Sequence, residues 1–213
     1  MIGVLFATHP EARPYLMLSG AKEVAAAPFA LFEHGSPPAV IIVSGMGKVP
    51  AALAAQTLIR EWHCDRILNA GVCGALVDKV RLTPGNIFRV SAASEGPSGP
   101  GVPVDAIRCT GDFWQNLPAA RLVTVEQPVF EAAERQRLAT WGELVDMEGA
   151  VVARVAQLYG IPWDMIKGIT DTADDGERIN LHRNLATVSE AVAAHLSNGI
   201  STYATPERRG PRR

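Results

Sequence analysis

Three aspartates follow an apolar segment in the C-terminal third of the chain, where residues 166–175 read I-K-G-I-T-D-T-A-D-D. A buried strand that ends in a carboxylate can present a catalytic acid, because ligands of open α/β sheets bind at the carboxyl ends of the strands. Asp171 is the acid nearest to the predicted strand. The same letters also fit a strand followed by a capped helix. Asp174 and Asp175 in particular are predicted to be turn or N-cap residues.

One glutamate and two glycine-rich segments stand at the ends of other predicted strands. Glu11 follows the first strand, S-G-M-G-K occupies residues 44–48, and N-A-G-V-C-G-A occupies residues 69–75. Backbone N–H groups in such turns can approach an oxygen-rich ligand, although tight packing of a strand against a helix explains the glycines about as well. Neither segment matches a Walker A loop or G-x-G-x-x-G. Their occurrence at neighbouring strand ends favours a ligand cleft.

The segment V-D-M-E-G-A, residues 145–150, lies at a predicted junction between a strand and a helix. A carboxylate there could accept hydrogen bonds from two vicinal hydroxyl groups at once. The alternative is that Glu148 only favours the positive end of the helix dipole from the first turn. The spacing alone leaves both interpretations open.

Apolar strands alternate with amphipathic helices along the chain. This pattern predicts an α/β sandwich with a largely parallel or mixed central sheet. We expect residues 94–118, which are rich in glycine and proline, to form a long surface loop. The predicted strands are 2–8, 28–34, 38–45, 65–76, 85–94, 121–125 and 161–170; the predicted helices are 48–62, 128–142, 147–160 and 183–196. Strands 28–34 and 38–45 are expected to form a hairpin or to lie next to each other.

Length and composition fit one globular domain. The chain has 213 residues, of which 47% are apolar and 20% charged. We expect residues 1–200 to form the domain and residues 201–213 a basic, disordered tail. The last seven residues contribute four arginines and one glutamate, so the rest of the chain carries a net charge of about −5 instead of −2. This acidic body predicts no nucleic-acid partner, with a weak contact through the tail as the minor alternative.

Other features of the sequence exclude further classes of protein. There is no run of about eighteen apolar residues, so no membrane span is predicted. The N-terminus lacks a basic region and reads as a core strand, which predicts a cytoplasmic protein. Cys64, Cys73 and Cys109 are widely spaced, and neither they nor the five histidines have metal-ligand spacing. We therefore expect reduced structural thiols and no metal.

Six motifs, in this order, resemble the nucleoside phosphorylase/nucleosidase superfamily, and within it the methylthioadenosine/S-adenosylhomocysteine nucleosidases. They are I-G-V-L-F-A-T-H-P-E, V-S-G-M-G-K-V, N-A-G-V-C-G-A-L, P-G-N-I, V-D-M-E-G-A and G-I-T-D, and the resemblance spans about residues 2–197. It implies a three-layer α/β/α sandwich with a mixed central sheet, a nucleoside substrate, a homodimer, and catalysis without a cofactor.

The resemblance also implies roles for individual residues. Glu11 stands where the hydrolytic branch has the glutamate that activates water. Met147 and Glu148 match the residues that hold the ribose, with Glu148 bridging the 2′ and 3′ hydroxyls. Asp171 matches the aspartate that protonates purine N7 as the base leaves. Gly71 lies in the turn that lines the sugar and nucleophile region.

Several substitutions depart from the family pattern. Val72 replaces a serine that binds phosphate in the phosphorylase branch, which disfavours phosphorolysis. Lys167 replaces the usual arginine on the strand that carries the acid, and Thr170 replaces a serine; the resemblance implies that both belong to the substrate-binding site. The aromatic residue that stacks on adenine has no clear match, and Phe130, with its neighbours at 128–129, is the candidate for that region. The base and the 5′ substituent therefore stay open.

The leading hypothesis is hydrolysis of the N-glycosidic bond of a purine nucleoside, with or without a 5′ modification of the methylthioadenosine, S-adenosylhomocysteine or futalosine type. One alternative is a phosphate-dependent phosphorylase acting on purine nucleosides or adenosylhopane-like compounds. Another is a nucleoside-binding sensor without turnover, although the presence of both Glu11 and Asp171 argues against it. A Rossmann oxidoreductase is disfavoured because G-x-G-x-x-G is missing.

Overall fold

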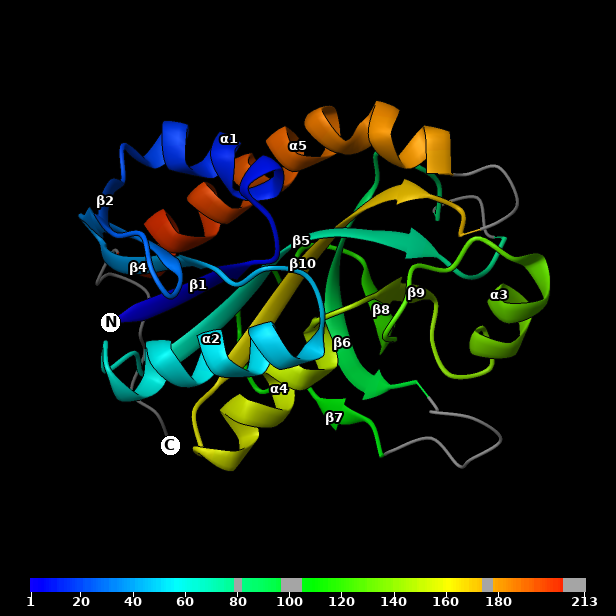
Figure 1. Cartoon of the computed structure of the whole chain (residues 1–213), viewed down its shortest axis with the longest axis horizontal. Coiled ribbons are helices and arrows are strands. Elements are labelled where there is room, and N and C mark those ends of the chain that lie inside the picture. Colours follow the sequence, from blue (N-terminus) through cyan, green and yellow to red (C-terminus); the bar gives the residue numbers. More distant parts are fainter. Residues whose placement is uncertain (79–81, 97–104, 174–177, 205–213) are drawn as a thin grey trace.

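A mixed β-sheet forms the middle of the molecule in the computed structural model, which describes residues 1–78, 82–96, 105–173 and 178–204 (Figure 1). The strands are β1 (Ile2–Phe6), β2 (Lys22–Ala25), β3 (Ala30–Gly35), β4 (Pro38–Val43), β5 (Arg66–Ala75), β6 (Ile87–Glu95), β7 (Ile107–Arg108), β8 (Ala119–Thr124), β9 (Leu144–Asp146) and β10 (Trp163–Asp171). The helices are α1 (His9–Ser19), α2 (Lys48–Arg60), α3 (Ala132–Leu138), α4 (Gly149–Leu158) and α5 (Arg178–Ala204).

Helices cover the sheet on both faces, which confirms the predicted three-layer sandwich. Helices α1 and α5 pack together on one face, and α2 and α4 pack together on the other (Figure 1). The strand order is β10-β6-β8-β9-β5-β1-β4-β3-β2, with parallel and antiparallel pairs. Strand β10 also pairs with β5, so that one half of the sheet curls round and closes on itself.

The central strands are apolar because both of their faces are covered. Every residue of β1 and β10 is buried, and so is nearly all of β5. Parallel strands of this kind read as continuous apolar runs rather than as alternating patterns. The carboxyl ends of β5 and β10 therefore emerge side by side, and the polar residues at those ends are held by a rigid core.

Helix α1 was not predicted, because two prolines interrupt its apolar periodicity. Thr8 caps the helix in a capping box with Glu11, and Pro10 lies in the first turn, where a missing N–H costs nothing. Pro14 lies inside the helix, and Gly20 ends it with a φ of 66°. Glu11 thus belongs to the first turn of a helix, and the preceding strand ends at Phe6.

The expected surface loop at 94–118 is only partly a loop. Strand β7 pairs with β6 inside it, and the side chains of Phe113 and Trp114 are buried. These rings pack against the sheet face covered by α5. The prediction was wrong here because glycine and proline dominate the composition of the segment and hide its two anchoring aromatic residues.

Two helices differ in length from their predictions, and two short strands were missed. Helix α3 begins four residues later than expected, while α5 begins earlier and continues to Ala204. Residues 201–204 are thus helical although they were assigned to the tail; residues 205–213 lie outside the described part, as do Asp174 and Asp175. Strands β2 and β9 have four and three residues, too few to show a period. No helix in the described part of the chain is long and apolar enough to cross a membrane.

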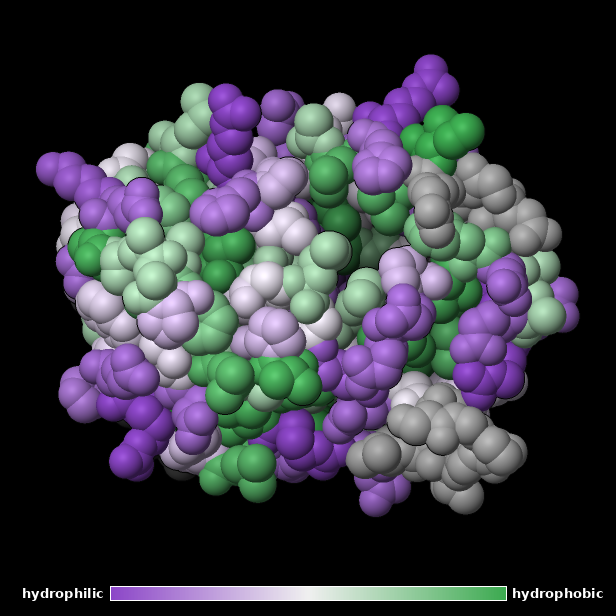
Figure 2. Space-filling model, in the orientation of Figure 1, coloured by the Kyte–Doolittle hydropathy of each residue, from purple (hydrophilic) through white to green (hydrophobic). Residues whose placement is uncertain are grey.

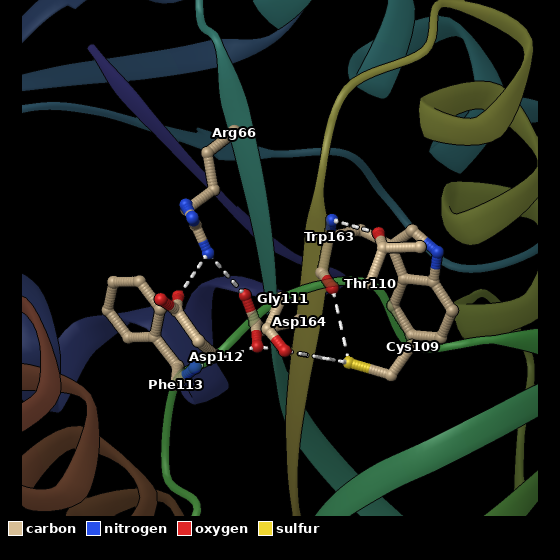
Figure 3. A network of polar contacts seen from close by, with 8 residues as sticks. All are labelled: Arg66, Cys109, Thr110, Gly111, Asp112, Phe113, Trp163 and Asp164. Atoms are coloured by element: carbon tan, nitrogen blue, oxygen red, sulfur yellow. Dashed lines mark hydrogen bonds and ion pairs between the residues drawn. The ribbon is translucent and has the colours of Figure 1, made fainter. Parts of the chain in front are cut away.

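A buried polar network joins the amino-terminal ends of β5 and β10 (Figure 3). Arg66 Nη1 lies 2.9 Å from Asp112 Oδ1 and 3.0 Å from Asp164 Oδ2. The backbone N–H of Phe113 donates to Asp164 Oδ1 at 3.0 Å, and the Cys109 thiol lies 3.8 Å from the same oxygen. Burial raises the pKa of the Asp164 carboxyl, while these donors oppose the rise. The network fixes residues 109–113 to the sheet at the amino-terminal end of β10, whereas Asp171 lies at the carboxyl end.

Substitution of Gly111 by alanine is expected to destabilise the protein, because the added Cβ would overlap the carboxylate of Asp164. The displaced carboxylate would lose its contact with Arg66, and overpacking and a broken buried ion pair together cost about 2–4 kcal/mol. Urea unfolding followed by circular dichroism measures the loss. Gly35→Ala is the matched control, since nothing lies within 4 Å of a Cβ at that position. Equal stabilities of the two variants would contradict the proposed role of the network.

Candidate active site

A cavity of about 500 Å³ opens at the carboxyl ends of the central strands. Its wall contains four acidic residues, contributed by α1, by the β9–α4 junction and by β10. Most of the remaining wall is apolar. The acids are Glu11, Asp146, Glu148 and Asp171; the large apolar side chains are Met46, Val72, Val125, Val129, Phe130, Val145, Met147, Leu181 and Leu185. No lysine or arginine belongs to this wall in the described part of the chain, so the cavity favours a neutral or cationic ligand with apolar surfaces.

Glu11 is held rigidly at one side of the cavity. Its Oε2 accepts hydrogen bonds from the Thr8 backbone N–H at 2.9 Å and the Thr8 hydroxyl at 2.7 Å. Its Oε1 accepts from the backbone N–H of Val72 at 2.9 Å. A Cβ on Gly71 would lie 2.7 Å from Oε1, so glycine is needed for this close approach. The Glu11 side chain therefore both completes the capping box of α1 and lines the cavity.

Glu148 connects the segment V-D-M-E-G-A with the glycine turn at residues 44–48. It is the N-cap residue of α4, yet its Oε1 accepts the backbone N–H of Gly47 at 2.7 Å instead of capping its own helix. The glycine turn at 44–48 thus donates to this carboxylate. Burial raises the pKa of Glu148 to about 7; Asp146 adds to the rise, and Lys167 opposes it.

Asp171 ends β10 and is almost fully buried. Its Oδ2 lies 2.7 Å from the Thr170 hydroxyl, and its Oδ1 accepts the backbone N–H of Ala173 at 2.9 Å. The register of β10 against β5 shifts between Ile169 and Asp171, and such an irregularity can re-aim a side chain at the end of a strand. A Cβ on Gly74 would lie 3.0 Å from Asp171 Oδ1. Gly74 therefore makes room for this acid, and it does so from within strand β5, because residues 71–74 are extended and do not form the turn that the sequence suggested.

The other predicted site residues divide into two groups. Val72, Met147, Thr170 and Phe130 line the cavity, and so do the neighbours of Phe130 at 128–129. Gly71 and Lys167 lie outside its wall.

Lys167 is buried, with its Nζ 2.8 Å from Asp146 Oδ2. Its partner Asp146 was missed, although it stands in V-D-M-E beside two residues that were selected.

Helix α5 also contributes residues that the sequence did not indicate. Leu181, His182 and Leu185 line the cavity from its first turns. Their spacing is that of an ordinary amphipathic helix, so only the position of α5 over the strand ends identifies them. Met46 closes another side and is two-thirds exposed.

The four acids of the wall are not arranged as metal ligands in the part of the chain that the structure describes. Among the residues that the structure describes, no group of three or more His, Cys, Asp or Glu side chains could hold a metal ion. The thiol of Cys73 lies in the wall, and burial raises its pKa above the ordinary range. It is therefore a protonated, unreactive group. What the arrangement can do is accept hydrogen bonds, stabilise developing positive charge and transfer protons.

Comparison with known proteins identifies the family. The protein-family model described as "Phosphorylase superfamily" matches residues 2–94 and 107–201 of the chain. The chain belongs to the phosphorylase superfamily. It is an enzyme of the nucleosidase and nucleoside phosphorylase class.

Two curated relatives and one solved structure illustrate the similarity. A 5′-methylthioadenosine/S-adenosylhomocysteine nucleosidase of Shewanella sp. (strain MR-7) is 22% identical, over 84% of this chain and 87% of the relative. A protein of the same name from Arabidopsis thaliana is 30% identical, over 75% of this chain and 66% of the relative. The structure of a futalosine hydrolase mutant of Helicobacter pylori superposes with a TM-score of 0.85 at 21% identity, covering 94% of this chain and 98% of that one.

The raised pKa of Glu148 predicts how stability depends on pH. An unfolded glutamate titrates near 4.5 and the folded one near 7, so the native state binds more protons between those values. The free energy of unfolding should therefore fall as the pH rises through this window. Glu148→Gln removes the titration, so its stability relative to the wild type should increase from about pH 5 to about pH 8. Urea unfolding at both pH values measures this difference. The exposed Glu131→Gln serves as the control, and parallel behaviour of the two variants would refute the assignment.

Proposed function

We propose that the enzyme hydrolyses the N-glycosidic bond of a purine nucleoside. The observation that carries this proposal is that Glu11, Glu148 and Asp171 share one cavity whose remaining wall is largely apolar. A nucleoside presents complementary features, namely a flat apolar base, a diol and a bond that breaks with separation of charge. The same reaction is supported by the similarity to two nucleosidases and to a futalosine hydrolase.

Asp171 is the proposed proton donor to purine N7. Cleavage leaves negative charge on the base, and a proton donated in the transition state lowers the barrier, typically by a factor of about 10² to 10⁴. The carboxyl is oriented on both oxygens, by the Thr170 hydroxyl and the Ala173 N–H. This fixed orientation allows it to point a proton at a ring nitrogen without rearrangement.

Glu11 is the proposed base for the attacking water. Its two oxygens are fixed by Thr8 and Val72, so a water bound to it is placed reproducibly. Water adds its hydroxyl to C1′ of the ribose, and its other proton passes to Glu11. The positive charge that builds on the ribose ring is stabilised by the surrounding carboxylates.

Water rather than phosphate is the proposed nucleophile. Phosphate sites use arginine or lysine side chains and backbone N–H groups, and no such cationic side chain belongs to the described cavity wall. Lys167 is engaged by Asp146, and Val72 offers no hydroxyl. For the same reason, nucleosides are favoured over nucleotides as substrates.

Substitution of Asp171 by asparagine is expected to lower kcat by about 10² to 10⁴ while leaving substrate binding measurable, because the amide cannot donate the proton. A panel of purine nucleosides, assayed with and without phosphate and scored for free base by chromatography, measures the effect. Asp105→Asn, at an exposed position, is the control. An unchanged kcat would refute the role of Asp171.

The same panel separates the alternatives. A ribose-1-phosphate product formed only with phosphate would replace the hydrolase by a phosphorylase. Tight nucleoside binding without release of base over hours would instead indicate a sensor. The cytoplasmic location expected from the sequence stays a prediction.

We also propose that a second copy of the chain covers the outer face of α2 and α4. Val49 and Leu53 on α2 and Leu158 on α4 are more than half exposed. Figure 2 shows hydrophobic surface, in green, over this part of the molecule. The Gln56 amide bonds to the Tyr159 hydroxyl at 3.0 Å and ties the two helices together. An apolar face of this kind is typical of an interface between subunits. Met46 lies at the start of α2 and reaches the cavity wall, so the interface would adjoin the active site.

Leu53→Glu is expected to convert a dimer into a monomer, because it places a charge in the proposed interface. Sedimentation velocity measures the oligomeric state. Leu18→Glu on α1 is a matched control, since Leu18 is similarly exposed at 58% against 52% for Leu53. A monomeric wild type, or equal dissociation of both variants, would exclude this interface.

A further inference from the structure

The ion pair between Lys167 and Asp146 is enclosed by the protein. The side chains are 3% and 2% exposed, and their charged atoms lie 2.8 Å apart. Lys167 is in the middle of β10, beside Gly71 of β5, whereas Asp146 ends β9. An ion pair this deeply buried is costly to desolvate, so breaking one half of it has large consequences.

Asp146 also forms hydrogen bonds that connect Lys167 with the start of α4, next to Glu148. Its Oδ2 accepts the backbone N–H of Gly149 at 2.9 Å, and its Oδ1 accepts the Thr124 hydroxyl at 2.5 Å. The Thr124 oxygen in turn accepts the N–H of Ala150 at 2.8 Å. The first two residues of α4 are thereby fixed to the carboxylate, and Glu148 directly precedes them.

Glu148 has charged neighbours on three other elements. Asp146 from β9 and Glu11 from α1 are acidic, and Lys167 from β10 is the cation among them; the Gly47 N–H completes the surroundings. Burial and the two acids raise the pKa of Glu148, whereas Lys167 and the Gly47 N–H lower it. Loss of the lysine would therefore leave three neighbouring carboxyl groups without their buried counter-charge.

We propose that Lys167 is a positioning residue that acts through Asp146 to hold Glu148 as the acceptor for the ribose diol. This inference rests on the proposed function and specifies a role for one residue in it. Lys167 lies outside the cavity wall, and its Nζ contacts Asp146, so this proposal assigns it no direct contact with substrate or phosphate. It differs in this from the substrate-binding role implied by the family resemblance.

A double-mutant cycle with Lys167→Met and Asp146→Asn tests this proposal. The single Lys167→Met variant should raise KM for adenosine on the order of ten-fold, as expected for a lost charge-assisted contact, but change KM for 2′-deoxyadenosine much less. The acid limb of the adenosine KM profile should move to higher pH, because Glu148 would accept a proton more readily. Glu148→Ala provides the reference for full loss of the diol contact. Lys167→Arg, which keeps the charge, should restore most of the adenosine affinity.

The double variant distinguishes action through Asp146 from an independent effect. It should lose less than the product of the two single losses, because removal of both charges leaves no unpaired ion in the interior. Losses that multiply, or equal losses for the two nucleosides, would overturn the proposal. A loss confined to kcat with an unchanged pH profile would instead indicate direct contact with the nucleophile.

Failure of the proposed function can be recognised separately. If the wild type releases no base, hydrolysis is excluded. Affinities for the same two nucleosides from titration calorimetry then replace KM in the cycle, and the free energy of unfolding of each variant is measured alongside. If Lys167 only stabilises the fold, its loss would weaken the binding of both nucleosides equally. That outcome would contradict the positioning role.

Discussion

Burial of several carboxylates in one largely apolar cavity is the constraint on which the rest of the site depends. Isolated charges of one sign are unfavourable in such surroundings, so each acid needs donors close by. The structure supplies one lysine, for Asp146, and backbone N–H groups for Glu11, Glu148 and Asp171. These donors come from several segments far apart in the sequence, and the acids consequently tie those segments together.

The glycine motifs are explained by the same constraint. Glycine turns in α/β proteins commonly bring backbone N–H groups to a phosphate, but here they serve the protein's own carboxylates. Gly47 donates to Glu148, and Gly71 and Gly74 leave room for Glu11 and Asp171. A site whose backbone donors are already committed to acids is suited to a neutral substrate. The same argument connects the lack of cationic side chains in the described cavity wall with the proposal that water is the nucleophile.

A second buried ion pair joins strands β5 and β10 at their amino-terminal ends, far from the cavity. The amino-terminal end holds Arg66 against Asp164, which fixes residues 109–113, whereas the carboxyl end presents Asp171 to the cavity. Because both strands are buried throughout, neither can slide relative to the other without exposing apolar surface. The stability of the framework and the geometry of the site are in this way carried by the same pair of strands.

The sequence alone indicated the layered α/β fold and singled out Glu11, Glu148 and Asp171, which lie together in the cavity wall, because continuous apolar runs and short motifs are local signals. Helix α1 and the buried part of 94–118 escaped it, since prolines and glycines mask their periodicity. Only the tertiary structure decided that Lys167 pairs with Asp146 and that α5 closes the cavity. Lys167 and Asp146 are 21 positions apart, and the cavity wall that α5 covers is assembled from several separate segments, so these partners are selected by the closure of the sheet rather than by any local pattern.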